Sequence, residues 1–336
     1  MSAAEIPLFK LKDGSTIPSV GMGCYMGGGA FTEKQVHDMC RKAIKAGYRH
    51  FDTATGYGNE QQVGDAIRDS GIPRSEFYIT TKLANGDHHR VCEAFEESFT
   101  RLNVQYIDLF LLHWPQASTG DIDFSQINAP NMALPPDEHP TFVETWKEIE
   151  KLLETVRSIG VSNFSIKTLE ELLSQCSIVP ATNQVELHPC LPQDDLKAYC
   201  DSKGILLTAY SLACLAYLDS GVTFLQLGRS KTFFAEQPFF RDLAVQYKVT
   251  PAQIILSWGV QRGTVVVPKS ENENRMLANI TLVKLSEEDM HKIGTFHLKP
   301  GMHKSLVEFH ADDCSVYGWK YEWLGWNMTK GGVVPQ

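Results

Sequence analysis

The sequence predicts an α/β protein built as a closed (β/α)8 TIM barrel, with a short N-terminal hairpin and long loops at the carboxyl end of the strands. Eight short apolar runs alternate with segments of helical period, which indicates parallel strands joined by helical crossovers. No sequence repeat and no interruption long enough for a second core divides the 336 residues, so we expect one barrel domain over 1–336. A doubly wound open sheet is the alternative, but no glycine fingerprint follows the first strand.

The first half of the chain accounts for the hairpin and four strands. An Asp-Gly turn at Asp13 and Gly14 predicts a hairpin over 7–17. Thr32 suits a helix N-cap and Gly47 a helix stop, so the helical spacing between them predicts a helix over 32–46. The remaining elements expected here are strands at 19–23, 48–51, 77–81 and 106–112 and helices near 61–68 and 91–102.

The second half continues the alternation after a long loop. Residues 115–140 have Pro, Asn, Asp and Ser throughout, and loops of that length in compact domains are usually functional. The tail, 299–336, is irregular and rich in Trp, Tyr, Gly and Pro, and we expect it to fold over a barrel end. The elements expected between them are strands at 156–161, 181–185, 205–209 and 265–267 and helices near 142–153, 166–173, 194–202, 239–247, 252–260 and 275–280.

Composition excludes several classes of function. A net charge of −9 argues against nucleic acid as a partner, because phosphate backbones require a basic surface. No apolar run reaches the roughly 18 residues of a membrane span. The amino terminus lacks the apolar stretch of a secretory signal, and the eight cysteines show no C-x-x-C spacing. We therefore expect a cytoplasmic protein with reduced thiols, no structural metal and no membrane partner.

Every strand from the second to the eighth ends in a polar or ionisable side chain. Barrel active sites lie at these carboxyl ends, so such residues are candidates for the site. An Asp–Lys pair alone is more often a structural ion pair, but seven polar strand ends together favour an active site. A short loop after Asp52 also delivers a phenol, Tyr57. The strand-end residues are Asp52, Lys82, His113, Ser162-Asn163, Gln184, Tyr210-Ser211 and Lys269-Ser270.

The motifs around these strand ends are, in order, GYRHFDTATGYGNE, ITTKL, IDLFLLHWP, GVSNF, NQVELHP, AYS and VVPKS, with Arg275 and Asn279 beyond them. In that order and spacing they resemble the aldo-keto reductases over nearly the whole chain. Other segments, for instance LPPDEHPTFVETWKEIEKL and LSWGVQRGTVVVPKSEN, look most like the fungal members of that family. The resemblance implies a barrel enzyme that reduces an aldehyde or ketone with NADPH.

The resemblance also implies a role for each of four residues. Tyr57 is the proton donor, Lys82 the cation that tunes it, Asp52 the counter-charge that holds Lys82, and His113 a neutral donor that orients the carbonyl. This fits the chemistry, because a tyrosine with a pKa near 10 is a poor acid at neutral pH. An adjacent ammonium favours the phenolate and should lower that pKa.

Further positions are implied for the cofactor and the substrate. Tyr25 and Trp114 match aromatic residues that line the substrate pocket, with plain core aromatics as the alternative. Glu271 and Glu273 lie close to the expected phosphate clamp and oppose it, so NADH stays open beside NADPH. The implied cofactor-binding residues are Ser162, Asn163, Gln184, Tyr210 and Ser211 near the nicotinamide, Lys269, Ser270 and Arg275 at the 2′-phosphate, and Asn279 at the adenine.

The chain departs from the family in three places. The usual Gly-Lys turn before strand 156–161 is missing, so we expect a strained entry to that strand. The run 212–217 replaces the loop of Pro, Leu and Gly that covers the cofactor pyrophosphate. Ala278 stands where an acid usually accompanies Asn279 at the adenine. We therefore expect weaker or slower NADPH binding than is usual in the family.

Two other functions remain as alternatives. One is a Schiff-base aldolase or lyase that uses Lys82 as its nucleophile. The other is a non-catalytic NADPH-binding barrel that serves as a sensing or interaction subunit. The sequence does not distinguish among carbonyl substrates, and both a monomer and a homodimer are compatible with it.

Overall fold

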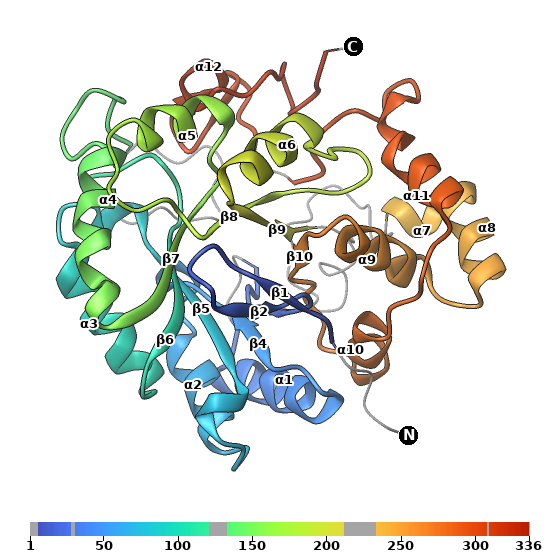
Figure 1. The fold of residues 1–336 in the computed structure, drawn as a ribbon, viewed down its shortest axis with the longest axis horizontal. Helices are drawn as coiled ribbons and strands as arrows, with labels where there is room; N and C mark the ends of the chain where they lie inside the picture. Colours follow the sequence, from blue (N-terminus) through green and yellow to red (C-terminus); the bar gives the residue numbers. More distant parts are fainter. Residues whose placement is uncertain (1–5, 28–30, 121–132, 212–232, 308, 336) are drawn as a thin grey trace.

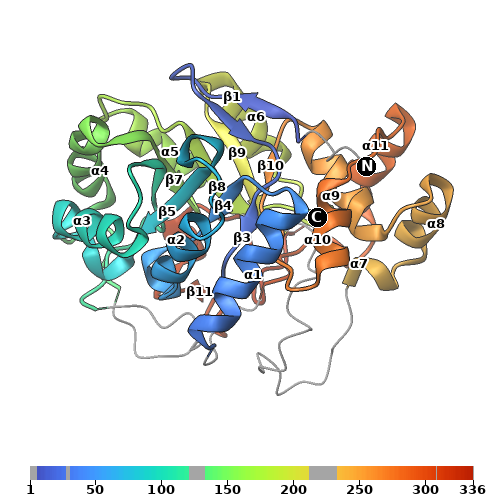
Figure 2. The same cartoon turned by 90° about the horizontal axis from the view of Figure 1, so that it is seen from below.

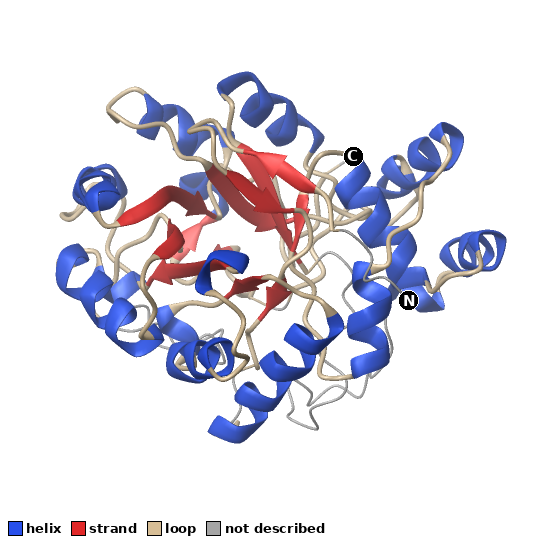
Figure 3. Ribbon diagram, turned by 60° about the horizontal axis from the view of Figure 1, so that its bottom comes forward, coloured by secondary structure: helices blue, strands red, loops and turns tan. Residues whose placement is uncertain are grey.

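Eight parallel strands form the inner wall of the computed structural model, and helices surround them (Figures 1 and 3). The structure describes residues 6–27, 31–120, 133–211, 233–307 and 309–335. The barrel strands are β3 (Met22–Gly23), β4 (His50–Asp52), β5 (Tyr78–Leu83), β6 (Ile107–Leu112), β7 (Val156–Ser162), β8 (Thr182–Glu186), β9 (Leu206–Tyr210) and β10 (Val265–Val266).

The sheet closes on itself. Each strand from β3 to β10 pairs in parallel with the next along the chain. Val20, just before β3, bridges Val266 of β10 in parallel, and the amide of Gly21 donates to the Val266 carbonyl at 2.8 Å. The parallel register aligns all carboxyl ends on one rim, as in the pair between Ser162 and Gln184. The predicted (β/α)8 barrel is confirmed.

The helices begin and end where the sequence carries capping signals. Thr32 forms a capping box with Gln35 at the start of α1 (Glu33–Ala46), and Gly47 ends that helix with a φ of 114°, which favours glycine. The other helices expected from the sequence are α2 (Glu60–Arg68), α3 (Val91–Leu102), α4 (Phe142–Glu150), α5 (Ile166–Leu173), α6 (Asp194–Lys203), α8 (Pro238–Tyr247), α9 (Pro251–Gln261) and α10 (Glu273–Ile280).

Several short elements were not predicted. They are the helices α7 (Phe233–Glu236), α11 (Glu287–Gly294) and α12 (Tyr321–Leu324), the 3-10 turns η1 (Thr55–Tyr57), η2 (Arg74–Glu76), η3 (Asn85–Asp87), η4 (Lys151–Glu154) and η5 (Phe296–Leu298), and a hairpin of β11 (Ser315–Val316) and β12 (Trp319–Lys320). Most of them are too short to show a period in the sequence.

Opposite ends of the barrel are covered by opposite ends of the chain. The predicted N-terminal hairpin forms from β1 (Leu8–Lys10) and β2 (Thr16–Pro18), and Figure 2 shows β1 at one end and β11 toward the other. In the hairpin, Asp13 accepts a 2.5 Å hydrogen bond from Ser158 near the start of β7. In the tail, the Val316 carbonyl accepts from Gln116, just beyond β6, at 3.0 Å. The tail therefore lies against the rim that carries the polar strand ends.

The connection from α4 to β7 is not strained. Instead of a left-handed glycine, the chain tightens into the 3-10 turn η4, with φ of −70° at Lys151 and −126° at Thr155. The amide and the hydroxyl of Thr155 both donate to the Leu152 carbonyl, at 2.8 and 2.9 Å. The strain predicted for this entry is wrong, because a 3-10 turn satisfies the last helical carbonyls without a positive φ.

Candidate active site

Asp52 and Lys82 form a buried ion pair on the carboxyl rim. The Lys82 ammonium lies 2.6 Å from Asp52 Oδ1, and the two residues are 0% and 3% exposed. Alternation along β5 turns Lys82 inward, because its neighbour Thr81 points outward and bonds Glu60 of α2. Adjacent parallel strands thus bring the acid and the ammonium together without any special loop.

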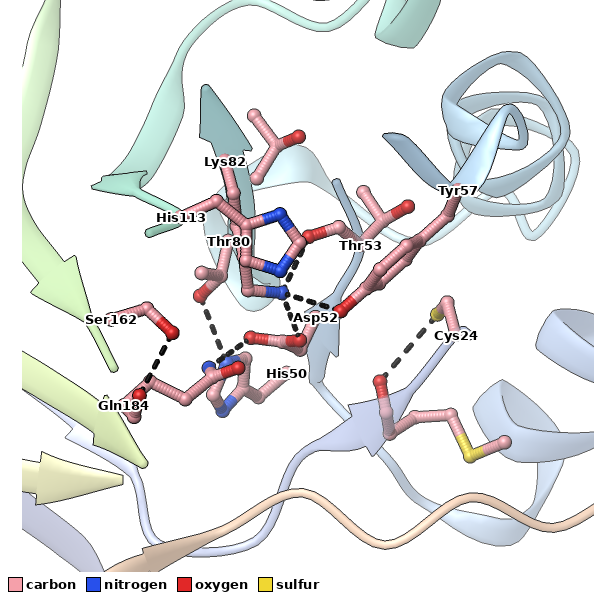
Figure 4. Close-up of polar contacts among 12 residues, drawn as sticks. Cys24, His50, Asp52, Thr53, Tyr57, Thr80, Lys82, His113, Ser162 and Gln184 are labelled. Carbon is pink, nitrogen blue, oxygen red and sulfur yellow. Dashed lines mark hydrogen bonds and ion pairs between the residues drawn. The ribbon is translucent and has the colours of Figure 1, made fainter. Parts of the chain in front are cut away.

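The Lys82 ammonium donates each of its three hydrogens to a neighbouring oxygen atom. Besides Asp52, it donates to the Thr53 carbonyl at 2.8 Å and to the Tyr57 hydroxyl oxygen at 3.3 Å (Figure 4). A lysine ammonium has three donors and no acceptor, so Lys82 is fully committed. The Tyr57 oxygen acts as an acceptor in this contact, so its own proton points away from Lys82. Tyr57 as a whole is half-buried, whereas Lys82 and Asp52 are buried.

The pKa of Tyr57 is raised well above its ordinary value of 10. Burial of the hydroxyl is the main cause, and the negative charge of Asp52 adds to it. This direction is opposite to the lowering expected from Lys82, because burial and the Asp52 charge together outweigh the ammonium. Tyr57 is therefore protonated at neutral pH, as a proton donor must be before it acts.

His113 lies beside the Tyr57 ring at the end of the next strand, β6. It follows β6, and its ring lies 5.7 Å from that of Tyr57 in an edge-to-face arrangement. Burial, and then the charge of Lys82, hold the pKa of His113 well below 6.5. The imidazole is therefore neutral at physiological pH, with one N–H donor and one acceptor nitrogen.

Gln184 ties the expected cofactor residues to the ion pair. Its amide nitrogen donates to Asp52 Oδ2 at 2.6 Å, so Asp52 uses one oxygen for Lys82 and the other for Gln184. Ser162 on the neighbouring strand donates to the Gln184 carbonyl at 2.8 Å. The contact between Gln184 and Asp52 crosses the barrel and was not predicted from the sequence.

Asn163 links His113 to Tyr210. Its amide nitrogen donates to the His113 carbonyl at 2.9 Å, and its oxygen accepts from the Tyr210 hydroxyl at 2.8 Å. The φ of Asn163 is 65°, a left-handed conformation that Asn tolerates better than most residues. The rim thus presents buried amides and hydroxyls held in fixed orientation by one another.

The remaining expected cofactor residues lie further round the rim. Ser211 follows β9 with a φ of 55°, and the run 212–217 after it lies outside the described residues. Lys269 and Ser270 follow β10, and the last two positions, Arg275 and Asn279, are on α10.

Asn59 is a residue of the site that sequence reasoning missed. It is fully buried, and its side chain accepts from the Thr53 hydroxyl at 2.6 Å and donates to the Cys24 carbonyl at 2.7 Å. These bonds fix both ends of the loop that carries Tyr57 and tie it to the segment that carries Tyr25. Its place directly after Tyr57-Gly58 in the matching motif was the available signal.

Both expected pocket aromatics, Tyr25 and Trp114, contact other aromatic side chains. The Tyr25 ring lies 4.9 Å from that of Tyr57. Trp114 is 3% exposed and meets the edges of Phe309 at 5.5 Å and Tyr317 at 5.2 Å, both from the tail. Tyr25 thus lies beside Tyr57, whereas Trp114 packs on aromatic partners from the tail that the sequence did not indicate.

Buried neutral histidines should make the fold sensitive to acid. Burial is the main cause that lowers the pKa of His50 to about 4 and of His88 to about 3. Below the unfolded pKa of about 6.5, the unfolded chain takes up protons that the folded chain refuses, so stability present above pH 6.5 is lost as the pH falls toward 4. Each group costs roughly 1.4 kcal/mol per pH unit in that window. We expect urea unfolding to show this fall between pH 7 and 5.

His88 has a matched control in the next residue. His88 is buried, whereas His89 is exposed. Replacing His88 by Gln should flatten the pH dependence by about one proton, and replacing His89 by Gln should change it far less, because burial lowers the pKa of His88 more than the neighbouring His89 does. Equal free energies of unfolding at pH 7 and pH 5 would contradict the expectation.

Neither a metal-binding group nor a membrane-spanning helix is found in the part of the chain that the structure describes. No three His, Cys, Asp or Glu side chains there are placed to hold one ion. No helix there combines the length and the apolar character needed to cross a bilayer.

The chain is similar in sequence and in fold to known aldo-keto reductases. The model of the Aldo/keto reductase family matches residues 19–296. A glycerol 2-dehydrogenase (NADP(+)) of Saccharomyces cerevisiae is 36% identical over 308 residues, covering 88% of this chain and 92% of the relative. An aldehyde reductase of the same yeast is 37% identical, covering 84% and 88%. The crystal structure of a Bombyx mori aldo-keto reductase in complex with NADP superposes with a TM-score of 0.74 at 34% identity, covering 88% of this chain and 94% of the other.

Proposed function

The chain belongs to the aldo/keto reductase family, and from that premise we propose how it works as an NADPH-dependent reductase of aldehydes or ketones. One observation carries the proposal. A fully buried ammonium, Lys82, is neutralised by Asp52 and places its third hydrogen on the oxygen of a half-buried phenol, Tyr57. Such a phenol keeps its proton until a stronger base appears beside it, which is what carbonyl reduction requires.

Tyr57 gives the proton and Lys82 stabilises what remains. Its raised pKa keeps the phenol protonated at neutral pH, and the alkoxide formed from a carbonyl is basic enough to take that proton. The phenolate left behind already accepts a hydrogen bond from the Lys82 ammonium, which strengthens as the oxygen gains charge. Asp52 keeps Lys82 charged and in position.

His113 orients the carbonyl. A neutral imidazole at the rim can donate its N–H to the carbonyl oxygen beside the Tyr57 hydroxyl, and its low pKa keeps it from competing as a proton donor. We assign Tyr25, whose ring lies 4.9 Å from that of Tyr57, and Trp114 to the lining of the substrate pocket. The two hydrogen-bond donors therefore converge on one oxygen atom.

The donor set on the rim fits NADPH, which supplies the hydride when bound. The buried amides of Asn163 and Gln184 and the hydroxyl of Ser162 complement a carboxamide, and Gln184 can accept through its oxygen since its nitrogen is committed to Asp52. We assign the ring of Tyr210, with Ser211, to the nicotinamide side. Lys269, Ser270 and Arg275 are assigned to the 2′-phosphate, and Asn279 to the adenine.

We expect NADPH to bind this chain more weakly than is usual in the family, since Ala278 cannot pair with Asn279 at the adenine. Ala278→Glu should lower the Kd about 2- to 10-fold, the gain expected of one added hydrogen bond. Quenching of tryptophan fluorescence by NADPH measures the Kd. Leu277→Glu, which adds the same charge at an exposed neighbour, should give no gain. A tight complex of the unmodified protein, or no gain with Ala278→Glu, would contradict this.

The geometry of the site supports the two alternative functions, a Schiff-base enzyme and a non-catalytic barrel, less than it supports a reductase. A Schiff-base mechanism needs a free amine, whereas Lys82 is held as an ammonium with every hydrogen donated. A non-catalytic barrel would not need the hydrogen-bonded group of Tyr57, Lys82 and Asp52. A panel of aldehydes and ketones followed at the NADPH absorbance band, with NADH in parallel, tests the proposed function. Borohydride trapping of a substrate adduct on Lys82 would instead favour the aldolase.

The remaining assignments are also proposals. We propose that residues 1–336 form one domain, that the partner is a small carbonyl compound, and that the protein works in the cytoplasm as a monomer or homodimer. The net charge of −9 supports a function without nucleic acid.

A further inference from the structure

Two acids stand near the residues assigned to the 2′-phosphate, and the structure places them differently. Glu271 forms an ion pair with Lys269, at 2.5 Å between Nζ and Oε1. Glu273 opens the first turn of α10 and is exposed. An exposed acid there stabilises the helix dipole and is screened by solvent. Of these two acids, Glu271 is the one that the described residues show paired with a residue of the clamp.

The pair of Lys269 and Glu271 is shielded from water. The two side chains are 12% and 24% exposed, so salt and solvent screen the attraction less than in a surface pair. Ser270 between them is buried, and its hydroxyl accepts from the amide of Asn272 at 3.2 Å. Asn272 in turn caps α10 by accepting from the Arg275 amide at 3.0 Å. These bonds fix the conformation of the connection between β10 and α10, which carries Lys269 and Glu271.

A carboxylate in this place acts against a phosphate dianion in two ways. Lys269 must give up its bond to Glu271 before it can serve the phosphate fully. The carboxylate then remains close to a group of the same sign, which is repelled. A cofactor that carries a 2′-hydroxyl in place of the phosphate meets neither cost.

We propose that Glu271 sets the cofactor preference of this chain. Because Glu271 holds Lys269, the difference in binding affinity between NADPH and NADH becomes smaller. The proposal rests on the assignment of Lys269, Ser270 and Arg275 to the 2′-phosphate. It makes Glu271 a specificity residue, and it separates the two acids that the sequence leaves equivalent.

The test is the Kd of NADPH and of NADH, each measured by fluorescence quenching without turnover. Glu271→Gln should tighten NADPH about tenfold and change NADH less than about twofold, because only NADPH carries the repelled group. Glu273→Gln changes the net charge equally and should alter both constants less than about threefold. Unchanged thermal unfolding of each variant shows that the fold is retained.

A double variant tests whether the released lysine serves the phosphate. Lys269→Met in the Glu271→Gln background, which leaves no carboxylate unpaired, should weaken NADPH binding about tenfold or more and NADH binding less than about twofold. An unchanged ratio of the two Kd values in Glu271→Gln, or an equal shift in Glu273→Gln, overturns the inference. Failure of the parent to bind either nucleotide would instead overturn the proposed function.

Discussion

Replacing Tyr57 by Phe should lower kcat for carbonyl reduction about 10²- to 10⁴-fold, the usual contribution of a positioned general acid. The phenyl ring keeps the contacts with Tyr25 and His113, whose rings lie 4.9 and 5.7 Å away, so the pocket keeps its shape. The KM for the carbonyl compound and the Kd for NADPH should therefore change only a few-fold. Steady-state rates at the NADPH absorbance band, together with fluorescence titration, measure all three.

The control is the same substitution away from the site. Tyr199→Phe on α6 removes a phenol that contacts none of these groups and should leave kcat unchanged. A Tyr57→Phe protein with full activity would remove the phenol from the mechanism and leave the Schiff-base alternative standing.

Replacing Lys82 by Met should lower both the stability and the reductase activity, and we expect the largest combined loss from this substitution. It leaves the Asp52 carboxylate buried with Gln184 as its remaining side-chain partner, and breaking one side of a buried ion pair costs about 3–5 kcal/mol of stability. Reductase activity should fall at least as far as in Tyr57→Phe, since the phenolate loses its cation. Urea unfolding and steady-state kinetics measure the two effects separately.

A second substitution separates stability from catalysis. Asp52→Asn combined with Lys82→Met removes both charges, so the free energy of unfolding should recover most of its loss. Activity should not recover, because the ammonium is still absent. A double variant as unstable as Lys82→Met, or one with restored turnover, would contradict the roles given to the pair.

The position of the candidate site followed from the sequence because parallel strands share a rim. Once 48–51 and 77–81 were recognised as consecutive strands, Asp52 and Lys82 had to meet, and the structure joins them at 2.6 Å. Helix starts could be predicted in the same way, because the capping boxes of Thr32 and Thr250 consist of residue types that the sequence itself shows.

Contacts across the barrel could not be predicted from the sequence in that way. Gln184 is separated from Asp52 by 132 positions in the chain, and no local pattern specifies their bond. The direction of the Tyr57 pKa was also mispredicted, since it depends on how closely Asp52 approaches and on how much water the hydroxyl loses. Distance and desolvation are properties of the folded chain.

The tail resisted prediction because its elements are too short to show a period. β11 and β12 have two residues each, and the turn between them has positive φ at both Tyr317 and Gly318, 44° and 89°. Such turns are usually marked by Asn-Gly or Asp-Gly, and a Tyr in the first position hides this one. Helix α11 did carry a signal, the N-cap Ser286 followed by acids, but it lies outside the strand–helix alternation.

A single-turnover experiment tests the central role of Tyr57 most directly. Protein loaded with one equivalent of NADPH is mixed with a reactive aldehyde, and the absorbance of the bound nucleotide is followed in H2O and in D2O. The parent should oxidise it rapidly with a solvent isotope effect, and Tyr57→Phe should bind it equally well but oxidise it at least about 100-fold more slowly. Oxidation by Tyr57→Phe at the parent rate would contradict the account.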